Sequence, residues 1–200
     1  MIWNEAQLIR RLKSHDHAAF EIVVERNYQP VFRQLWHLCH DEEVACDLTQ
    51  ETFARAWKSL DSFAAKSSVR TWLYTIAVRV WWRWKQSATS QNVPLDGWAD
   101  LVPDEAPTPA QKLEVRILRE DVQAALSRMP SPFRETLVLF YIENLKYREV
   151  SEVLDVSIGT VKSRLHEGCK RLRADLQRAQ DHENQILQGD SPCEANLKTT

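Results

Sequence analysis

The chain has 200 residues, of which 44% are hydrophobic, a composition that suits one or two compact domains. Its formal net charge is −2, but the charges are distributed unevenly, so a nucleic-acid partner is not excluded. The four cysteines form no CxxC pair, no charged-then-apolar segment opens the chain, and no stretch approaches roughly 20 apolar residues, so we expect a soluble, cytoplasmic protein without membrane insertion.

Apolar residues at three- and four-residue steps predict three helices before residue 61. The first covers Glu5 to Lys13; Asp16 caps the second, which Pro30 should bend or break; the third runs from its cap, Asp41, to Leu60. The stripe of the second helix is Phe20, Val24, Tyr28, Val31, Leu35 and Leu38. In the third helix the inward residues are Ala45, Leu48, Thr52, Phe53, Ala56 and Leu60, and the outward residues are Asp47, Gln50, Glu51, Ala54 and Lys58.

A fourth helix, capped by Ser67 or Ser68, is predicted to expose aromatic rings and cations on one face. Its buried stripe is Val69, Leu73, Ile76 and Val80; opposite lie Thr71, Tyr74, Val78, Trp82 and Lys85, with Arg79 and Trp81 at the edges. Rings stack on unpaired bases while cations hold phosphates, so the face suits single-stranded or melting DNA. Alternatively, several of these tryptophans pack against neighbouring helices.

The segment from Ser87 to Pro109 contains four prolines and no strong periodicity, which predicts an extended tether. Between Pro94 and Ala110 it holds four carboxylates and no Lys or Arg, whereas both neighbouring segments are basic. An acidic tether could lie along a positively charged channel as a nucleic-acid mimic, or it could simply be a soluble linker.

The second half is predicted to contain a helix-turn-helix between Asn144 and Arg173, with its turn at Asp155 to Ser157. One helix from Ala110 to Arg128 and another that begins at Ser131-Pro132 should support it. The apolar stripe of the second helix of the motif is Ile158, Val161, Leu165, Cys169, Leu172 and Leu176, and Ser157 can cap it. Its polar side suits the major groove and the phosphates beside it, so we interpret it as a recognition helix.

We therefore expect an all-α fold of two small helical domains joined by a flexible acidic linker. The expected ranges are 1–87 for the first domain, 88–109 for the linker, 110–178 for the second domain and 179–200 for a disordered tail.

Two parts of the chain together resemble bacterial RNA polymerase sigma factors of the extracytoplasmic-function (ECF) group of the sigma-70 family. The first is DLTQETFARAWKSLDSF (Asp47 to Phe63) followed by RTWLYTIA (Arg70 to Ala77), and the second is GTVKSRL (Gly159 to Leu165). The resemblance covers roughly Glu5 to Leu176 and agrees with the two-domain layout. It implies a transcription initiation factor that is not itself an enzyme and needs no cofactor.

The resemblance implies that region 2 docks on the clamp helices of the polymerase beta-prime subunit and opens the minus-ten element. It implies that region 4 recognises the minus-35 element of promoter DNA and rests on the beta flap, and that an anti-sigma factor holds the protein inactive. The residues implied for core polymerase binding are Asp47, Gln50, Glu51, Ala54 and Lys58. Those implied for minus-ten DNA are Trp72, Tyr74, Arg79 and Trp82, to which the basic character of the same helix adds Arg70, Arg83 and Lys85. Those implied for minus-35 DNA are Lys162, Ser163, His166 and Glu167, to which the polar, basic side of the recognition helix adds Thr160, Arg164 and Lys170.

Four positions depart from the family pattern. Arg79 stands where Asn is common and Arg83 where Asp is common, which favours phosphate binding over selection of a flipped base. Glu167 stands where a basic residue is common, so its carboxylate must accept from a cytosine amino group or point away from phosphate. Lys146 occupies the usual Ser cap, a loss of about 1 kcal/mol unless another group replaces the cap.

Other classes of protein remain as alternatives. A stand-alone regulator with a LuxR-like helix-turn-helix would explain only the second half of the chain. A metal or redox sensor is suggested by His37, Cys39, His40 and Cys46, although their spacing matches no common zinc pattern. An enzyme has little support, because the sequence contains no P-loop, GxGxxG, HExxH or GxSxG motif.

Overall fold

The computed structural model describes residues 4–65, 67–88 and 120–187, with side chains up to residue 181. The helices of the first half are α1 (Glu5–Leu12), α2 (His17–Cys39), α3 (Glu42–Lys58), the 3-10 turn η1 (Leu60–Ser62) and α4 (Val69–Ala88). Those of the second half are a helix over 120–128, α6 (Ser131–Leu137), the π-helical segment η2 (Val138–Ile142), α7 (Tyr147–Leu154) and α8 (Ile158–Leu187). The described residues contain no strand, which confirms the predicted all-α class. None of their helices is both long and apolar enough to cross a membrane.

Local side-chain caps fix most helix starts where the sequence predicts them. The side chain of Asp16 accepts a hydrogen bond from the backbone N–H of Ala19 at 3.3 Å, and that of Asp41 accepts one from Val44 at 2.9 Å. Such caps satisfy N–H groups that have no partner within the helix. By contrast, α2 is helical throughout, so the prediction that Pro30 could break it is wrong.

The first four helices pack around an apolar core that α2 and α3 share with α4. The inward side of α3 is buried as predicted. In the predicted apolar stripe of α2, the buried residues are Val31, Leu35 and Leu38. Phe20, Val24 and Tyr28 are only partly buried, because Ala19 and Val23 occupy the inner face at that end of the helix.

In the second half, α8 packs along α6. A Cβ atom placed on Gly168 would lie 3.2 Å from both Cγ and Cδ1 of Leu137, so the absence of a side chain permits this close approach. The helix continues to Leu187, and the expected disordered tail is therefore wrong for residues 179–187. The predicted linker and the start of the helix expected from Ala110 lie outside the described residues.

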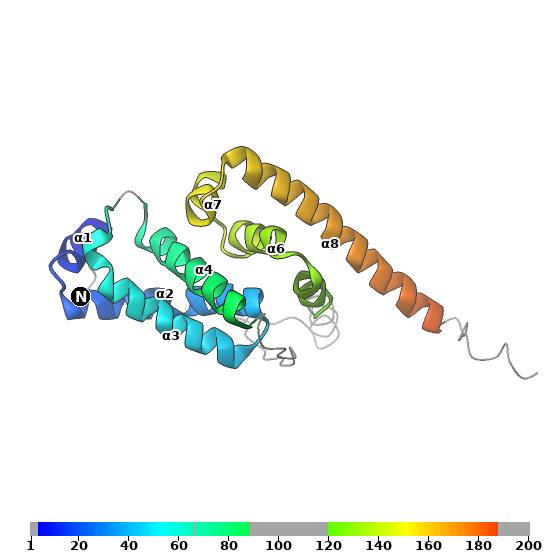
Figure 1. The fold of residues 1–200 in the computed structure, drawn as a ribbon, viewed down its shortest axis with the longest axis horizontal. Helices are drawn as coiled ribbons and strands as arrows, with labels where there is room; N and C mark the ends of the chain where they lie inside the picture. The colour runs from blue at the N-terminus through cyan, green and yellow to red at the C-terminus, as the bar shows by residue number, and fades with distance from the viewer. Residues whose placement is uncertain (1–3, 66, 89–119, 188–200) are drawn as a thin grey trace, which may run out of the picture.

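The two halves are in direct contact. Figure 1 shows α7 and α6 beside α4, with α8 extending away from the first-half helices. The buried apolar residues form one continuous cluster, from Leu8 in α1 to Leu165 in α8. The sequence predicted two bundles on a tether; the structure shows that they share a core.

Candidate polymerase and nucleic-acid interfaces

The outer face of α3 is available to a partner. Asp47, Gln50, Ala54 and Lys58 are exposed, as predicted. Glu51 is half-buried, and its carboxylate accepts a hydrogen bond from Nε of Arg55 at 2.7 Å. These polar side chains lie on one side of a helix whose other side is fixed in the core, so they form a rigid surface.

Helix α4 is buried on two sides. Ser68 caps it by accepting a hydrogen bond from the N–H of Thr71 at 3.1 Å, and Val69, Leu73 and Val80 face the first-half core as predicted. The opposite side was expected to be exposed, and this is wrong at four positions. Thr71, Tyr74, Val78 and Trp81 are each at most 1% exposed. The second half covers this side, because α4 has apolar residues around most of its circumference.

The predicted minus-ten residues fall into two groups. Trp72 is half-buried, with its ring centroid 4.7 Å from that of Phe63. Arg79 and Arg83 are exposed, although Nη1 of Arg83 lies 3.9 Å from Oε1 of Glu51. The other four contact the second half of the chain: Arg70, Tyr74, Trp82 and Lys85.

Three of these four make specific polar contacts with the second half. The Tyr74 hydroxyl donates to the Glu143 carboxylate, and Lys85 donates to the Ser131 hydroxyl. Arg70 donates from Nη2 to Oε2 of Glu143 at 3.1 Å. Burial is the main cause that raises the pKa of Tyr74, and the negative charge of Glu143 raises it further. The hydroxyl therefore stays protonated and can donate.

The helix-turn-helix forms where the sequence predicts it. Asp155 adopts the left-handed conformation (φ 53°) that ends α7, and Ser157 accepts a hydrogen bond from the N–H of Thr160 at 3.0 Å. At the start of α7, the Glu149 carboxylate accepts the N–H of Lys146 at 2.8 Å, whereas the Lys146 side chain makes no capping hydrogen bond, so the acceptor that a Ser cap would provide is not replaced by this residue. Val161 and Leu165 are buried, whereas Ile158, the first residue of the predicted stripe, is 44% exposed.

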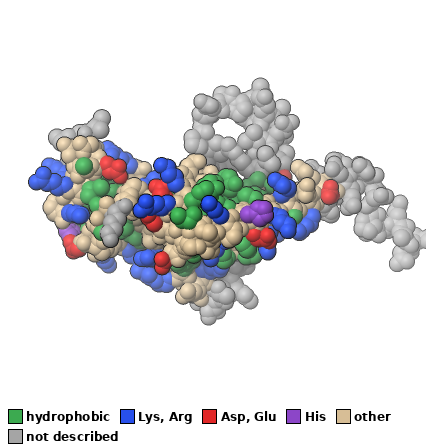
Figure 2. Space-filling model, turned by 90° about the horizontal axis from the view of Figure 1, so that it is seen from above, with side chains coloured by type: hydrophobic (Ala, Val, Ile, Leu, Met, Phe, Trp, Pro, Cys, Tyr) green, Lys and Arg blue, Asp and Glu red, His purple; other side chains and the backbone are tan. Residues whose placement is uncertain are grey.

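The predicted minus-35 residues lie mainly on the outer side of α8. Lys162, Ser163, His166 and Lys170 are exposed, and Thr160 is partly exposed. Figure 2, seen from the side of α7 and the start of α8, shows Lys and Arg side chains around an apolar patch. The exposed large apolar side chains of the described residues are Tyr141, Tyr147 and Ile158.

Two residues of the predicted minus-35 set are directed partly inward. Arg164 is half-buried, close enough to the buried Glu135 to lower the pKa of that carboxyl. Glu167 accepts a hydrogen bond from Nε of Arg171 at 2.8 Å. Because Arg171 balances its charge within one helical turn, Glu167 need not repel a nearby phosphate.

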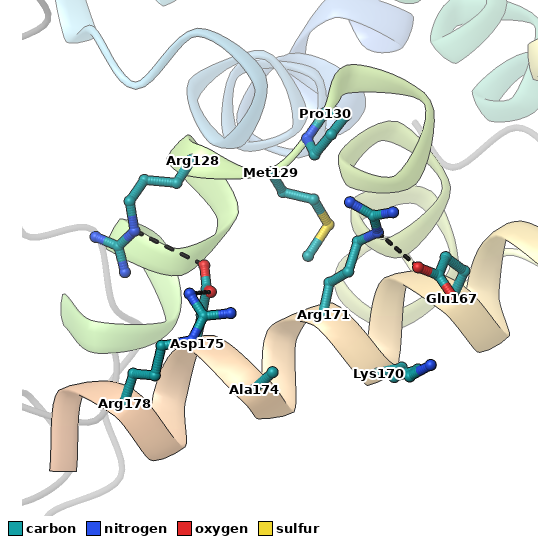
Figure 3. Close-up of a pocket in the computed structure, with 9 residues that line it drawn as sticks. All are labelled: Arg128, Met129, Pro130, Glu167, Lys170, Arg171, Ala174, Asp175 and Arg178. Carbon is teal, nitrogen blue, oxygen red and sulfur yellow. Dashed lines mark hydrogen bonds and ion pairs between the residues drawn. The ribbon is translucent and has the colours of Figure 1, made fainter. Parts of the chain in front are cut away.

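A cavity of about 250 Å³ lies between the helix over 120–128 and α8. Figure 3 shows that its cations are largely paired: Arg171 points to Glu167, and Arg128 and Arg178 both approach Asp175. The corresponding N–O distances are 2.8, 3.7 and 3.1 Å. The pair of Arg128 and Asp175 joins the two helices, the other two pairs lie within α8, and together they leave little uncompensated charge for a ligand.

The four residues that suggested a metal site do not form a common set of ligands. Nδ1 of His37 and Nδ1 of His40 lie 2.7 and 2.5 Å from the two polar side-chain atoms of Gln123. The thiol of Cys39 donates to the carbonyl of Asp41, and burial raises its pKa to about 12, which disfavours a thiolate ligand. Cys46 lies beside the Tyr28 hydroxyl. Within the described part of the chain, no group of three or more His, Cys, Asp or Glu side chains is arranged to hold a metal ion.

Sequence reasoning missed Glu143, which is buried and contacts three residues of the first half. The available signal was its position directly after the apolar run LVLFYI, where a carboxylate needs a partner. Its partners could not be found from local spacing, because Arg33 and Arg70 are 110 and 73 residues away.

Glu135 of α6 provides a pH-dependent contact between the halves. The carboxyl is buried and accepts a hydrogen bond from the Trp82 indole. Burial raises the pKa of Glu135 to about 7, although the Trp82 hydrogen bond and the charges of Arg164, Lys85 and Arg134 oppose the rise.

The raised pKa of Glu135 predicts that stability falls as pH increases. A carboxyl with a raised pKa binds its proton more tightly in the folded chain than in the unfolded chain. The stability that this proton contributes is therefore lost as pH rises from the ordinary carboxyl pKa of 4.5 through the folded-state pKa of about 7. Relative to Glu135→Gln, the wild-type free energy of unfolding should fall by about 2 to 3 kcal/mol between about pH 5 and 8, as measured by urea unfolding. Glu152→Gln, an exposed change, is the control; parallel curves for wild type and Glu135→Gln would contradict the prediction.

Comparison with known protein families gives two matches in the order of the two halves. Residues 23–90 match the model of sigma-70 region 2, and residues 119–172 match that of sigma-70 region 4. The chain is 34% identical to the ECF RNA polymerase sigma factor SigE of Mycolicibacterium smegmatis over 78% of its own length, and it spans 60% of that relative. It is 30% identical to the ECF sigma factor SigM of Bacillus subtilis, over 72% of this chain and 86% of SigM.

A solved structure supports the fold. The sigma factor RpoE of Bartonella quintana, crystallised with the anti-sigma factor NepR, superposes with a TM-score of 0.64 at 23% identity. The alignment covers 79% of this chain and 96% of RpoE. At this level of identity the similarity concerns the fold alone.

Proposed function

The chain belongs to the extracytoplasmic-function group of sigma-70 family sigma factors, which direct RNA polymerase to promoters, and on this premise we propose which of its surfaces bind polymerase and DNA. Sigma factors are not enzymes: they supply binding energy, and the polymerase performs phosphoryl transfer. We place this activity in the cytoplasm, with the polymerase and the chromosome.

The outer face of α3 is the proposed contact with the beta-prime clamp helices. It comprises Asp47, Gln50, Glu51, Ala54 and Lys58. The support for this proposal is that these side chains share one helix face whose reverse side is fixed in the core. A rigid, polar helix face loses little conformational entropy on binding.

Helix α4 is the proposed minus-ten surface. Arg79 is exposed and Trp82 is one turn away and half-buried, so a ring and a cation lie close enough to act on one nucleotide. Stacking contributes roughly 1 to 3 kcal/mol per base, and the guanidinium can hold the adjacent phosphate. Arg70, Trp72, Tyr74, Arg83 and Lys85 complete the proposed set.

Helix α8 is the proposed minus-35 recognition element. Ser163 and His166, on its exposed side, suit base edges, whereas Lys162 and Lys170 suit phosphates. Thr160, Arg164 and Glu167 complete the set, with Arg164 and Glu167 oriented by neighbouring side chains. We assign the beta flap contact to the exposed apolar side chains of the second half, Tyr141, Tyr147 and Ile158.

Lys170→Ala is expected to weaken binding to a duplex minus-35 fragment several-fold and equally across sequences. The slope of log affinity against log salt should become shallower by about one, because one fewer counterion is released. Fluorescence anisotropy at several salt concentrations measures both quantities. Lys58→Ala, which removes the same charge from α3, should leave the slope unchanged; an unaltered slope in Lys170→Ala would remove this residue from the interface.

An anti-sigma factor is a further proposed partner. The Bartonella quintana RpoE structure contains the anti-sigma factor NepR, and this chain shares the fold of RpoE. We propose that a protein of this kind holds the present chain inactive.

The two-domain match is the single observation that favours a sigma factor over a stand-alone regulator, because a regulator has no use for region 2. The test is transcription with purified core polymerase on a genomic library, followed by sequencing of transcript 5′ ends. A sigma factor makes core polymerase initiate at defined positions. Transcripts that are the same with and without the chain would refute the proposal.

A further inference from the structure

A buried ionic cluster joins the two halves of the chain. Glu143, at the end of η2, has a fully buried carboxylate, and Arg33 of α2 donates to it from Nε at 3.0 Å and from Nη2 at 3.1 Å. Arg70 of α4 donates to the same carboxylate at 3.1 Å, and the Tyr74 hydroxyl also donates to it. We call Arg33, Arg70, Tyr74 and Glu143 the interdomain cluster.

All three partners of the Glu143 side chain come from region 2. Taking a carboxylate out of water costs several kcal/mol, and this cost is offset only while charged donors surround it. The next residue, Asn144, has a left-handed backbone (φ 55°), and the N–H of Glu143 donates to the carbonyl of Val138 at 3.0 Å. Region 4 therefore fixes where the carboxylate lies, and region 2 supplies the groups that make its burial tolerable.

Other polar contacts follow the same interface. The side chain of Gln123 lies between the imidazoles of His37 and His40 in α2. Nη1 of Arg134 in α6 donates to the carbonyl of Leu38 at 2.7 Å. These contacts lie at the opposite end of the interface from α7, so the two halves are held in one relative orientation.

We propose that the free chain adopts a closed state in which region 4 docks on the α4 surface and the interdomain cluster fixes the docking. In this state Tyr74 is fully buried, so its ring cannot stack on a base, and Arg70, Trp82 and Lys85 are engaged in polar contacts with region 4. The chain must open before α4 can bind unpaired DNA. The masking, though not the closed state itself, rests on the proposed minus-ten role of α4.

The first test measures closure without DNA. Small-angle X-ray scattering of the full chain should give a larger radius of gyration for Arg33→Gln and for Glu143→Gln than for wild type. Each variant removes one side of the cluster, and the two changes lie in different domains, so misfolding of one domain cannot explain both. Glu152→Gln, the same change at an exposed position of α7, should leave the scattering unchanged.

The second test measures masking with a fluorescein-labelled oligothymidylate, because stacking on aromatic rings tolerates any base. Loss of a charge-assisted hydrogen bond should shift the open-to-closed ratio about tenfold, and the apparent affinity of the free chain should rise by a similar factor while the closed state dominates. Arg33→Gln is the decisive variant, because it loses a positive charge and would otherwise bind the oligonucleotide more weakly. Glu152→Gln controls for the charge change in Glu143→Gln.

The outcomes separate the closed state from the role of α4. A larger radius of gyration with tighter oligothymidylate binding in both variants supports the proposal. Scattering and oligothymidylate affinity that are both unchanged in the two variants overturn the role of the interdomain cluster in fixing the closed state, and they leave the proposed role of α4 intact. Opening without any gain in affinity overturns the masking, and with it the assignment of α4 as the surface for unpaired DNA.

Discussion

Replacing both Arg79 and Trp82 with alanine is expected to slow open-complex formation about a hundredfold. The Trp82 ring offers a stacking surface of roughly 1 to 3 kcal/mol for one base, and the exposed Arg79 adds a phosphate contact. Both interactions exist only after the strands separate, so their loss raises the barrier to opening. The measurement is the rate of permanganate reactivity at the minus-ten thymines of a promoter identified from transcript 5′ ends.

Core binding controls for the integrity of the double variant, because neither residue lies on the outer face of α3. Affinity for core polymerase should stay within about twofold of wild type. Trp82→Phe keeps a ring but loses the hydrogen bond to Glu135, so it should retain most of the opening rate. If the double variant opened promoters at the normal rate, α4 would not be the melting surface.

Replacing both Asp47 and Gln50 with arginine is expected to weaken binding to core polymerase about a hundredfold. The change replaces one negative charge and one neutral amide with two cations on an exposed face, so it removes both polar contacts with the clamp helices and buries charges that have no matching partner there. Because both side chains are exposed, the fold should tolerate the substitutions. Fluorescence anisotropy of labelled chain titrated with core polymerase measures the loss.

A matched charge reversal on a neighbouring helix provides the control. Glu21→Arg combined with Gln29→Arg, both exposed on α2, changes the charge by the same three units as the double variant while leaving the outer face of α3 intact. It should bind core polymerase normally. Equal loss in both proteins would show that overall charge, and not the α3 face, governs the association.

The closed state connects these predictions. Trp82 contacts Glu135 in α6, whereas Arg79 is exposed in the same structure. A variant that opens the chain should therefore change DNA binding through Trp82 and its masked neighbours, and not through Arg79. Core polymerase would then act on this equilibrium by favouring the open chain.

The sequence by itself determined the helical elements and the family. Asp16, Asp41, Ser68 and Ser157 each bond a backbone N–H three residues later, so short-range chemistry fixes these helix starts. Apolar residues at helical spacing then identified the buried face of α3 and the turn of the helix-turn-helix. These features depend on neighbours in the sequence, which is why they were predictable.

Only the tertiary structure decided which surfaces are covered. Helical spacing placed Tyr74 opposite the buried stripe of α4, but it could not show that a second domain buries that side as well. The burial of Glu143 depends on Arg33 and Arg70, which are distant in the sequence. The physical reason is that periodicity reports the orientation of a side chain within its own helix, whereas burial depends on which distant segment packs against it.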